Sequence, residues 1–238
     1  MNSNSRISVC LATYNGEKYV REQLVSILKQ LSPNDEIIVS DDHSTDKTLS
    51  VIESLNDPRI RIIINELGKG YSSNFENAIN HSTGDYIFLS DQDDVWIENK
   101  VKIMMNELQS FDLVVSDAII SDSFLKPTLG SHFKAHNTKI GFLNNWLKTR
   151  YIGACMAFRR EIFSKLLPFP SQSKWCAHDY WIANIAEFFF KVKLVDIPLI
   201  KYRRHGNNAS TGGEKSKNSI FHKIIVRIYT FLQLIKRM

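Results

Sequence analysis

GDYIFLSDQDDVW, which spans residues 84–96, is the most informative stretch of the 238-residue sequence. Tyr86–Leu89 is a short aromatic and aliphatic run behind a glycine, which predicts a buried β-strand. Three carboxylates follow within four residues, those of Asp91, Asp93 and Asp94. Like charges this close raise each other's pKa, and a divalent cation with oxygen ligands removes the repulsion. A solvated acidic turn is the alternative, but open α/β sheets bind ligands at the carboxyl ends of buried strands, which favours a metal site.

Strands and helices alternate on both sides of this stretch. Further strands are expected at residues 7–12, 36–40, 60–64 and 113–115. Amphipathic helices are expected at residues 17–30, after Thr45, after Gly70 and at residues 97–109, because apolar residues recur there at helical spacing. This order predicts an α/β fold with a mainly parallel sheet, flanked by helices and joined by right-handed crossovers.

The alternation fades after about Ser116, and residues 121–137 are polar and loop-like. We therefore expect two halves, residues 1–118 and residues 119–213, followed by a tail of residues 214–238. The tail holds six basic residues and one acidic residue, so it carries the whole net charge of +5. The neutral body argues against a nucleic-acid-binding protein.

The three cysteines, Cys10, Cys155 and Cys176, have no CxxC spacing and cannot all pair. This pattern suits a reducing cytosol and argues against a zinc site or a disulfide framework. The polar start lacks the apolar core of a signal peptide, and no apolar run approaches the roughly 20 residues of a spanning helix. We expect a cytoplasmic protein.

Apolar residues in the tail recur at helical spacing from Ile220 to Ile235, with Lys223, Arg227 and Lys236 around them. A basic amphipathic helix of this kind is typical of proteins that lie on an anionic membrane surface. The alternative is an ordinary helix packed on the domain or, in a homo-oligomer, on a partner subunit. We expect residues 218–238 to hold the protein peripherally on the inner face of the cell membrane.

Polar residues also follow the first two expected strands: Thr13, Tyr14 and Asn15 after the first, and Asp41 and Asp42 after the second. These ends should line one crevice together with Asp91. Neither G-x-G-x-x-G nor G-x-x-x-x-G-K-[ST] is present, so a diphosphate held through a metal fits better than one held by a helix N-terminus.

Five segments in register resemble the family 2 glycosyltransferases, and together they span residues 6–213. They are ISVCLATYNG (7–16), IVSDDHSTD (38–46), SDQDDVW (90–96), HDYW (178–181) and YRRHGNN (202–208). The third and fourth look most like the bacterial rhamnosyltransferase branch. The resemblance implies a GT-A type fold, with a nucleotide-sugar-binding half (1–118) and an acceptor-binding half (119–213), and inverting transfer from a nucleotide-diphosphate sugar.

The resemblance also implies roles for individual residues. Thr13, Tyr14 and Asp42 would hold the base beside Asn15, and Asp91 would face the ribose. Asp93 would bind Mg²⁺ or Mn²⁺ on the diphosphate, with Asp94 extending the acidic motif. His205 is a further candidate metal ligand, and Arg203 and Arg204 are candidates for holding the leaving phosphates. For these last three residues a solvated basic turn is the alternative.

Asp179 is the expected general base, because inversion needs a carboxylate that takes the proton of the acceptor hydroxyl. The alternative is that Asp179 only caps a helix. Gly153 would allow close backbone approach on the acceptor side. Trp175, Tyr180 and Trp181 are candidates for an acceptor platform, with plain packing as the alternative.

These observations predict a metal-dependent inverting glycosyltransferase of bacterial surface polysaccharide synthesis, such as capsule or O-antigen, acting on a saccharide or lipid-linked acceptor. The resemblance favours dTDP-L-rhamnose as donor, and UDP-galactose, UDP-glucose or another UDP-sugar is the alternative. Alternatives from other classes are a nucleotidyltransferase and an inactive membrane-bound assembly subunit.

Overall fold

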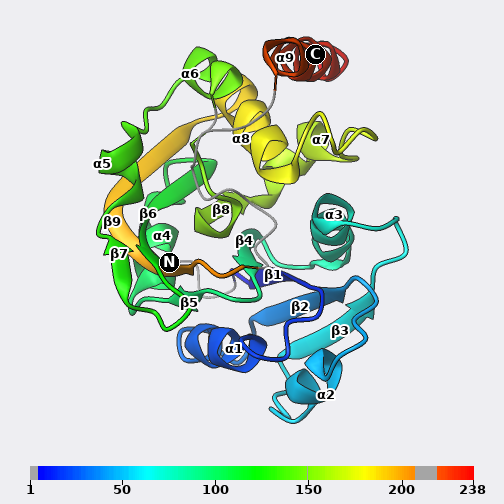
Figure 1. Cartoon of the computed structure of the whole chain (residues 1–238), viewed down its shortest axis with the longest axis vertical. Coiled ribbons are helices and arrows are strands. Elements are labelled where there is room, and N and C mark those ends of the chain that lie inside the picture. Colours follow the sequence, from blue (N-terminus) through cyan, green and yellow to red (C-terminus); the bar gives the residue numbers. More distant parts are fainter. Residues whose placement is uncertain (1–4, 149, 207–218) are drawn as a thin grey trace.

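Aliphatic runs in the first half of the chain form four parallel strands in the order β3-β2-β1-β4. The computed structural model describes residues 5–148, 150–206 and 219–238. The strands are β1 (Ile7–Thr13), β2 (Glu36–Asp41), β3 (Ile60–Ile64) and β4 (Tyr86–Asp91). Their connecting helices are α1 (Val20–Leu28), α2 (Thr48–Glu53) and α3 (Tyr71–His81). Helices α1 and α2 lie on one face of the sheet and α3 lies on the other (Figure 1).

The chain after β4 extends the same sheet with strands of both directions. They are β5 (Val95–Trp96), β6 (Leu113–Ser121), β7 (Pro127–Leu129), β8 (Met156–Arg159) and β9 (Val192–Arg203). Strand β8 runs antiparallel between β4 and β6, whereas β6 and β9 are parallel. The α/β class is confirmed, and antiparallel pairing begins only after β4.

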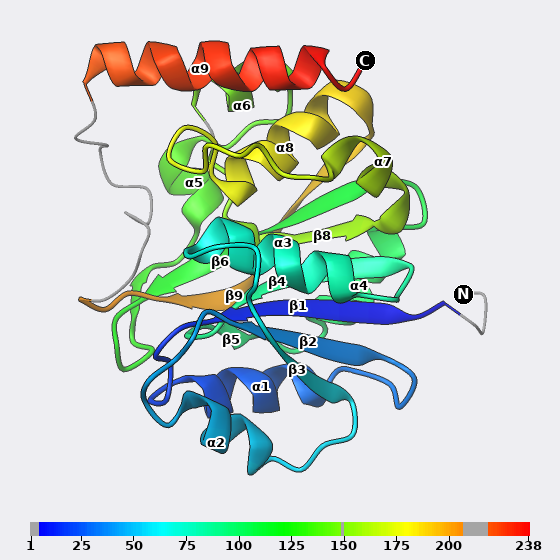
Figure 2. The same ribbon diagram turned by 90° about the vertical axis from the view of Figure 1, so that its right-hand side faces the viewer.

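The helices after β4 pack around these strands, and most of them extend the molecule away from α1 and α2 (Figure 2). They are α4 (Lys100–Glu107), α5 (His132–His136), α6 (Phe142–Leu147), α7 (Phe163–Leu166) and α8 (His178–Phe189), with short 3₁₀ turns at Gly153–Cys155 and Arg160–Ile162.

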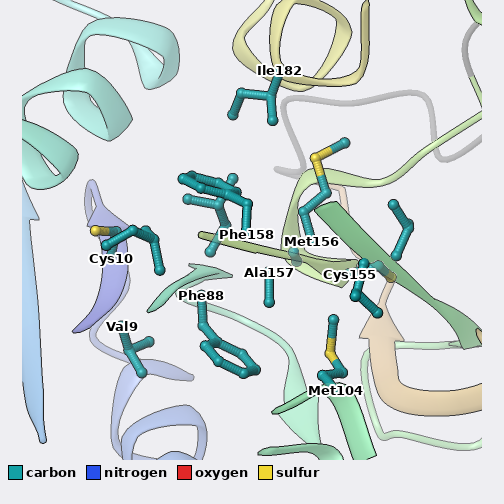
Figure 3. Packing of buried hydrophobic residues seen from close by; sticks show 14 of the residues in the cluster. Val9, Cys10, Phe88, Met104, Cys155, Met156, Ala157, Phe158 and Ile182 are labelled. Carbon is teal, nitrogen blue, oxygen red and sulfur yellow. The ribbon is translucent and has the colours of Figure 1, made fainter. Parts of the chain in front are cut away.

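One hydrophobic core runs through both halves (Figure 3). Val9 and Phe88 from the parallel strands are fully buried, as are Met156 and Phe158 of β8 and Ile182 of α8. Burying an aliphatic or aromatic side chain of this size contributes roughly 1.5–3 kcal/mol. The expected boundary at residue 118 falls inside β6, so the two halves share a strand as well as a core.

Residues 121–137, expected to be a loop, contain β7 and α5. The buried carboxylate of Asp117 organises this segment: it accepts hydrogen bonds from the Ser131 hydroxyl (2.5 Å) and the Phe133 backbone N–H (2.9 Å). Ser131 also caps α5 by accepting from the Lys134 backbone N–H (3.1 Å). The prediction was wrong because these contacts start from a strand residue outside the segment.

The expected tail helix is α9 (Ile220–Ile235), and it lies beside α6 and α8 at the opposite end of the molecule from α2 (Figures 1 and 2). Thr230 and Leu234 are fully buried, and the Trp146 indole N–H donates to the Arg227 carbonyl (3.0 Å). Residues 207–218, which include the start of the expected tail, lie outside the described residues, and Ser219 caps α9. In the described part of the chain, no helix combines the length and hydrophobicity needed to cross a bilayer.

Candidate active site

The carboxyl ends of β1, β2 and β4 meet at one edge of the sheet, as the sequence predicts. The strand register pairs Thr13 of β1 with Asp41 of β2, and Ala12 of β1 with Asp91 of β4. The polar loops that follow these strands therefore begin side by side.

Thr13 and Asp41 are hydrogen-bonded to each other at this edge of the sheet. Thr13 is buried, and its hydroxyl donates to Asp41 Oδ1 (2.9 Å). The Asp41 carboxylate also accepts from the Ser44 backbone N–H (2.7 Å) and the Ser44 hydroxyl (2.6 Å). The Thr13 side chain thus shapes the turn after β2 from within.

Asp42 connects the turn after β2 to the loop before α3. Its two carboxylate oxygens accept from the Asn65 side-chain amide and from the Gly70 backbone N–H, both at 2.8 Å. Asp42 remains partly exposed. Gly70 has φ 112°, a conformation that side chains disfavour, which explains a glycine at this position.

The loop after β1 is held by its neighbours and leaves an aromatic ring exposed. The Gln92 amide accepts from the Tyr14 backbone N–H and donates to the Tyr14 carbonyl, both at 2.9 Å. Asn15, at φ 48°, donates its N–H to the Ser44 hydroxyl (2.9 Å) and accepts from the Thr45 N–H (2.8 Å). The Tyr14 side chain stays exposed at the rim.

Asp93 and Asp94 are buried after β4, and Asp91 is partly exposed. Burial, followed by repulsion from Asp93 and Asp179, raises the pKa of Asp91 to about 7. Burial and the charges of Asp93 and Asp91 raise the pKa of Asp94 well above its usual value. Asp94 Oδ2 has no hydrogen-bond partner in the described residues. Clustered carboxylates with an unsatisfied oxygen are the hard donors that Mg²⁺ and Mn²⁺ prefer.

Arg203 at the end of β9 braces the acidic segment from inside. Its backbone N–H donates to Asp94 Oδ1 (2.9 Å), and its guanidinium donates to the Asp93 carbonyl (2.7 Å) and to Glu22 (2.5 Å). The side chain is 5% exposed. Arg203 therefore acts as an internal brace rather than as an open phosphate contact, which was the role expected for it.

His205 reaches the acids from the same strand end. Its Nε2 lies 2.8 Å from Asp93 Oδ2, and its ring stacks on Tyr19 with centroids 4.8 Å apart. Burial raises the pKa of Asp93, while the hydrogen bond from His205 opposes this rise. Arg204 is partly exposed, and its backbone N–H donates to the Ser121 carbonyl (2.8 Å). Of the two arginines, Arg204 is the more accessible.

Lys100, which the sequence analysis missed, lies fully buried beneath the acids. Its ammonium donates to the Ala154 carbonyl (2.8 Å) and lies over the Trp96 ring. Burial lowers the pKa of Lys100 to about 8, and the charges of Asp94 and Asp91 are among those that oppose this fall. A sequence signal did exist, since Lys100 occupies an apolar-face position at helical spacing from Ile97 and Met104.

Helix α8 places Asp179 within electrostatic reach of the same crevice. The charge of Asp179 contributes to the raised pKa of both Asp91 and Tyr71. Its Oδ1 accepts from the Tyr180 backbone N–H (2.7 Å) and its side chain is partly exposed. The N-cap residue of α8 is Ala177, so Asp179 lies inside the first turn rather than at the cap position.

Gly153 lies close to the side chains of His178 and Asp179. A Cβ atom at Gly153 would be 2.7 Å from His178 Nε2 and 3.5 Å from the Asp179 Cβ. Only glycine permits this approach without displacing His178. Tyr71, 48% exposed and near Asp179, is an aromatic residue at this site that the sequence analysis missed.

The three aromatic candidates for the acceptor site are less accessible than expected. Trp181 is fully buried and donates to the Leu166 carbonyl (2.8 Å), while the Tyr180 hydroxyl donates to the Trp146 carbonyl (2.5 Å). Trp175 packs edge-on against Tyr229 of α9, with ring centroids 5.3 Å apart. Trp181 thus belongs to the core, as the packing alternative expects.

The described residues do not supply a full set of ligands for a cation. Across residues 5–148, 150–206 and 219–238, no three acidic, histidine or cysteine side chains gather into a metal-binding group. The pair Asp93 and His205 offers an oxygen and a nitrogen 2.8 Å apart. A cation held there would need further oxygen ligands from a bound molecule or from water.

The family model described as Glycosyl transferase family 2 matches residues 8–167. The UDP-Glc:alpha-D-GlcNAc-diphosphoundecaprenol beta-1,3-glucosyltransferase WfgD of Escherichia coli is 33% identical over 42% of this chain and 40% of that protein. The dTDP-rhamnosyl transferase RfbG of Shigella flexneri is 42% identical over 39% of this chain and 34% of that protein. The chain therefore spans less than half the length of these two relatives.

A similar solved structure is S. aureus TarS 1–349 in complex with UDP-GlcNAc, with a TM-score of 0.68. The match covers 85% of this chain and 60% of the TarS 1–349 chain, at 21% sequence identity. At this identity the likeness concerns the fold.

We expect Lys100→Met to lower the free energy of unfolding by about 2–4 kcal/mol, because it removes a buried cation beside Asp91 and Asp94. The pKa of Lys100 is about 8 in the folded protein against an ordinary value of 10.5, so the unfolded chain binds more protons between these pH values. Stability of the wild type should therefore rise with pH across that window, and the variant should lack this rise.

Urea unfolding at several pH values measures both effects. Lys102→Met is the matched control, because Lys102 is exposed on the same helix and should change stability by no more than about 0.5 kcal/mol. Equal losses in the two variants would contradict the role given to Lys100.

Proposed function

The chain belongs to glycosyl transferase family 2, and from this premise we propose that it transfers a sugar from a nucleotide-diphosphate donor to an acceptor hydroxyl with inversion. The observation that carries the proposal is that Asp179 of α8 lies close enough to Asp91 of β4 to raise its pKa. A carboxylate suited to a general base thus lies within electrostatic range of a carboxylate suited to donor binding.

The donor site would lie along the carboxyl ends of β1, β2 and β4. Tyr14 offers an exposed ring for the base, and Asp42 and Asp91 are partly exposed carboxylates that can accept from base or ribose groups. Thr13 and Asn15 contribute by fixing these loops, through their bonds to Asp41 and Thr45.

Asp93 and His205 would hold Mg²⁺ or Mn²⁺, with Asp94 supplying negative charge behind them. The raised pKa of each carboxyl and the unpartnered Asp94 Oδ2 support this assignment. When bound, the cation supplies Lewis acidity that neutralises charge on the departing diphosphate. Arg203 would hold the acidic segment in place through its bond to Asp94. Of Arg203 and Arg204, only Arg204 is partly exposed.

Asp179 would take the proton from the acceptor hydroxyl as that oxygen attacks the anomeric carbon. The close approach of Gly153 brings the acceptor-side backbone next to this carboxylate. Tyr71 adds an exposed aromatic face near Asp179, which suits the C–H surface of a sugar better than buried Trp181 does.

We propose dTDP-L-rhamnose as the donor to test first and bacterial surface polysaccharide, such as capsule or O-antigen, as the product. The similarity to dTDP-rhamnosyl transferase RfbG supports this choice, while that to WfgD supports UDP-glucose as the alternative. A binding screen that includes UDP-galactose and UDP-N-acetylglucosamine separates these donors. An inactive assembly subunit would bind none of them.

Helix α9 would hold the protein peripherally on the inner face of the membrane. Its exposed apolar residues are Ile220, Phe221, Ile224, Ile228, Phe231, Leu232 and Ile235. Residues 219–238 contain four basic residues and no Asp or Glu, which complements an anionic membrane and disfavours pairing with a second copy of the same helix.

Replacing Asp93 with Ala should abolish the metal-dependent part of donor binding, because the substitution removes the most direct metal ligand. Calorimetric titration of the donor with Mn²⁺ and with EDTA measures that part. Asp196→Ala, which removes an exposed carboxylate on β9, is the control and should bind as the wild type does. Unchanged Mn²⁺-dependent binding in Asp93→Ala would refute the metal assignment.

The variant Asp179→Asn should keep donor affinity but lose about 10²–10⁴-fold in kcat, the usual contribution of a general base. Asparagine retains the Oδ1 that accepts from the Tyr180 N–H, so a purely structural role would survive the change. Steady-state kinetics and donor titration on the same preparation make the comparison. A kcat within a few-fold of the wild type would leave Asp179 a structural residue.

We expect Phe221→Ser/Ile228→Ser to weaken binding to phosphatidylglycerol vesicles by about 100-fold, because two large apolar side chains leave the membrane face. Both residues are exposed, so the fold should persist. Vesicle flotation gives the measurement, and Phe124→Ser, which changes an exposed apolar residue between β6 and β7, is the control. Undiminished flotation would mean that α9 is not the membrane face.

A further inference from the structure

A cationic cleft lies between α5 and α6, apart from the donor site. It encloses about 260 Å³, and its lining residues are Asn137, Lys139, Asn144, Asn145, Leu147, Lys148 and Arg150. This volume is below the roughly 300–1,000 Å³ of pockets for whole drug-sized ligands, so the cleft suits a compact group.

The positive charge of the cleft is largely uncompensated. Lys139 and Lys148 form no ion pair within the described residues, and Arg150 donates one guanidinium N–H to the Asn137 carbonyl (2.7 Å). Burial is the main cause that lowers the pKa of nearby His136, and the positive charges of Arg150 and Lys148 lower it further. Three cations around a small volume favour an anion.

Glu187, which is bonded to the lining residue Asn145, is already engaged by several protein donors. Glu187 accepts hydrogen bonds from the Gly141 backbone N–H (2.9 Å), the Asn145 side-chain amide (3.1 Å) and the Tyr151 hydroxyl (2.5 Å). Burial raises the pKa of Glu187, so its negative charge is disfavoured. Glu187 thus orders the cleft wall without balancing the lysines.

The cleft adjoins the apolar face of α9. The Arg227 guanidinium donates to the carbonyl of Leu147, a lining residue, and α6 lies beside α9 in both views (Figures 1 and 2). Leu143 and Leu147 of α6 are 63% and 52% exposed and add to the apolar surface there. A phosphate in the cleft would therefore have an apolar surface next to it for its lipid chain.

A short segment links the cleft to the proposed general base. Arg150, a lining residue, precedes Gly153 by three residues, which span at most about 11 Å. Gly153 in turn packs against Asp179. A path of contacts and chain thus runs from α9 through Leu147 and Arg150 to Gly153 and Asp179.

We propose that this cleft binds the phosphate or diphosphate that joins the acceptor sugar to its lipid. The inference rests on the proposed function, and the diphosphoundecaprenol acceptor named for WfgD supports the choice of ligand chemistry. Lys139, Lys148 and Arg150 hold the anion, while the attached sugar extends towards Asp179 and the lipid follows α6 and α9.

The test compares Lys139→Gln/Lys148→Gln with the control Lys126→Gln/Lys134→Gln, which removes the same charge from exposed positions outside the cleft. Flotation uses phosphatidylcholine vesicles containing either polyprenyl phosphate or phosphatidylglycerol. The cleft variant should lose about 30-fold in affinity for the polyprenyl phosphate vesicles, at roughly 1 kcal/mol for each lysine. Its affinity for phosphatidylglycerol vesicles should match that of the control.

Kinetics separate this inference from the proposed function. The cleft variant should show a raised KM for a polyprenyl-diphosphate-linked acceptor, with unchanged donor binding and unchanged turnover on a phosphate-free glycoside. Equal losses of affinity for both vesicle types would mean that the cleft binds anionic head groups in general, which contradicts the inference. No loss of affinity for either vesicle type would also overturn it. If even the wild type transferred no sugar, the proposed function would fail while the flotation result still decided the cleft.

Discussion

The burial of carboxylates at the end of β4 is the constraint on which the rest of the site depends. Carboxylates removed from water are costly unless other groups compensate them. Lys100 lies beneath the cluster, Arg203 donates to Asp94, and His205 lies against Asp93. These partners come from α4 and from the end of β9, so the acids are held only when the second half of the sheet is in place.

The same arrangement explains why the two halves form one functional unit. The parallel strands of the first half present the acids, and α8 of the second half presents Asp179. Strand β8 lies between β4 and β6, and the 3₁₀ turn before it places Gly153 against the side chains of His178 and Asp179. The proposed donor and acceptor sites therefore lie near each other although their residues come from different parts of the chain.

The surface features next to the acidic cluster have an order of their own. The proposed general base, the cationic cleft and helix α9 are connected through Asp179, Gly153, Arg150 and Leu147. A molecule with a sugar, a phosphate and a lipid chain has the same order of chemical groups. This correspondence is the basis for connecting the proposed membrane face with the proposed chemistry.

The sequence by itself determined the strand and helix alternation, the acids at the strand ends and the amphipathic tail, because these follow from local periodicity and from parallel strands ending at one edge. Only the tertiary structure decided which partners meet. His205 contacts Asp93 across 112 residues, and Arg203 is buried as a brace although its neighbours in sequence suggested an exposed turn. Lys100 donates to the Ala154 carbonyl, 54 residues away, and Asp117 accepts from the Ser131 hydroxyl, 14 residues away. Such choices depend on compensating buried charge between distant segments, and no local pattern encodes that balance.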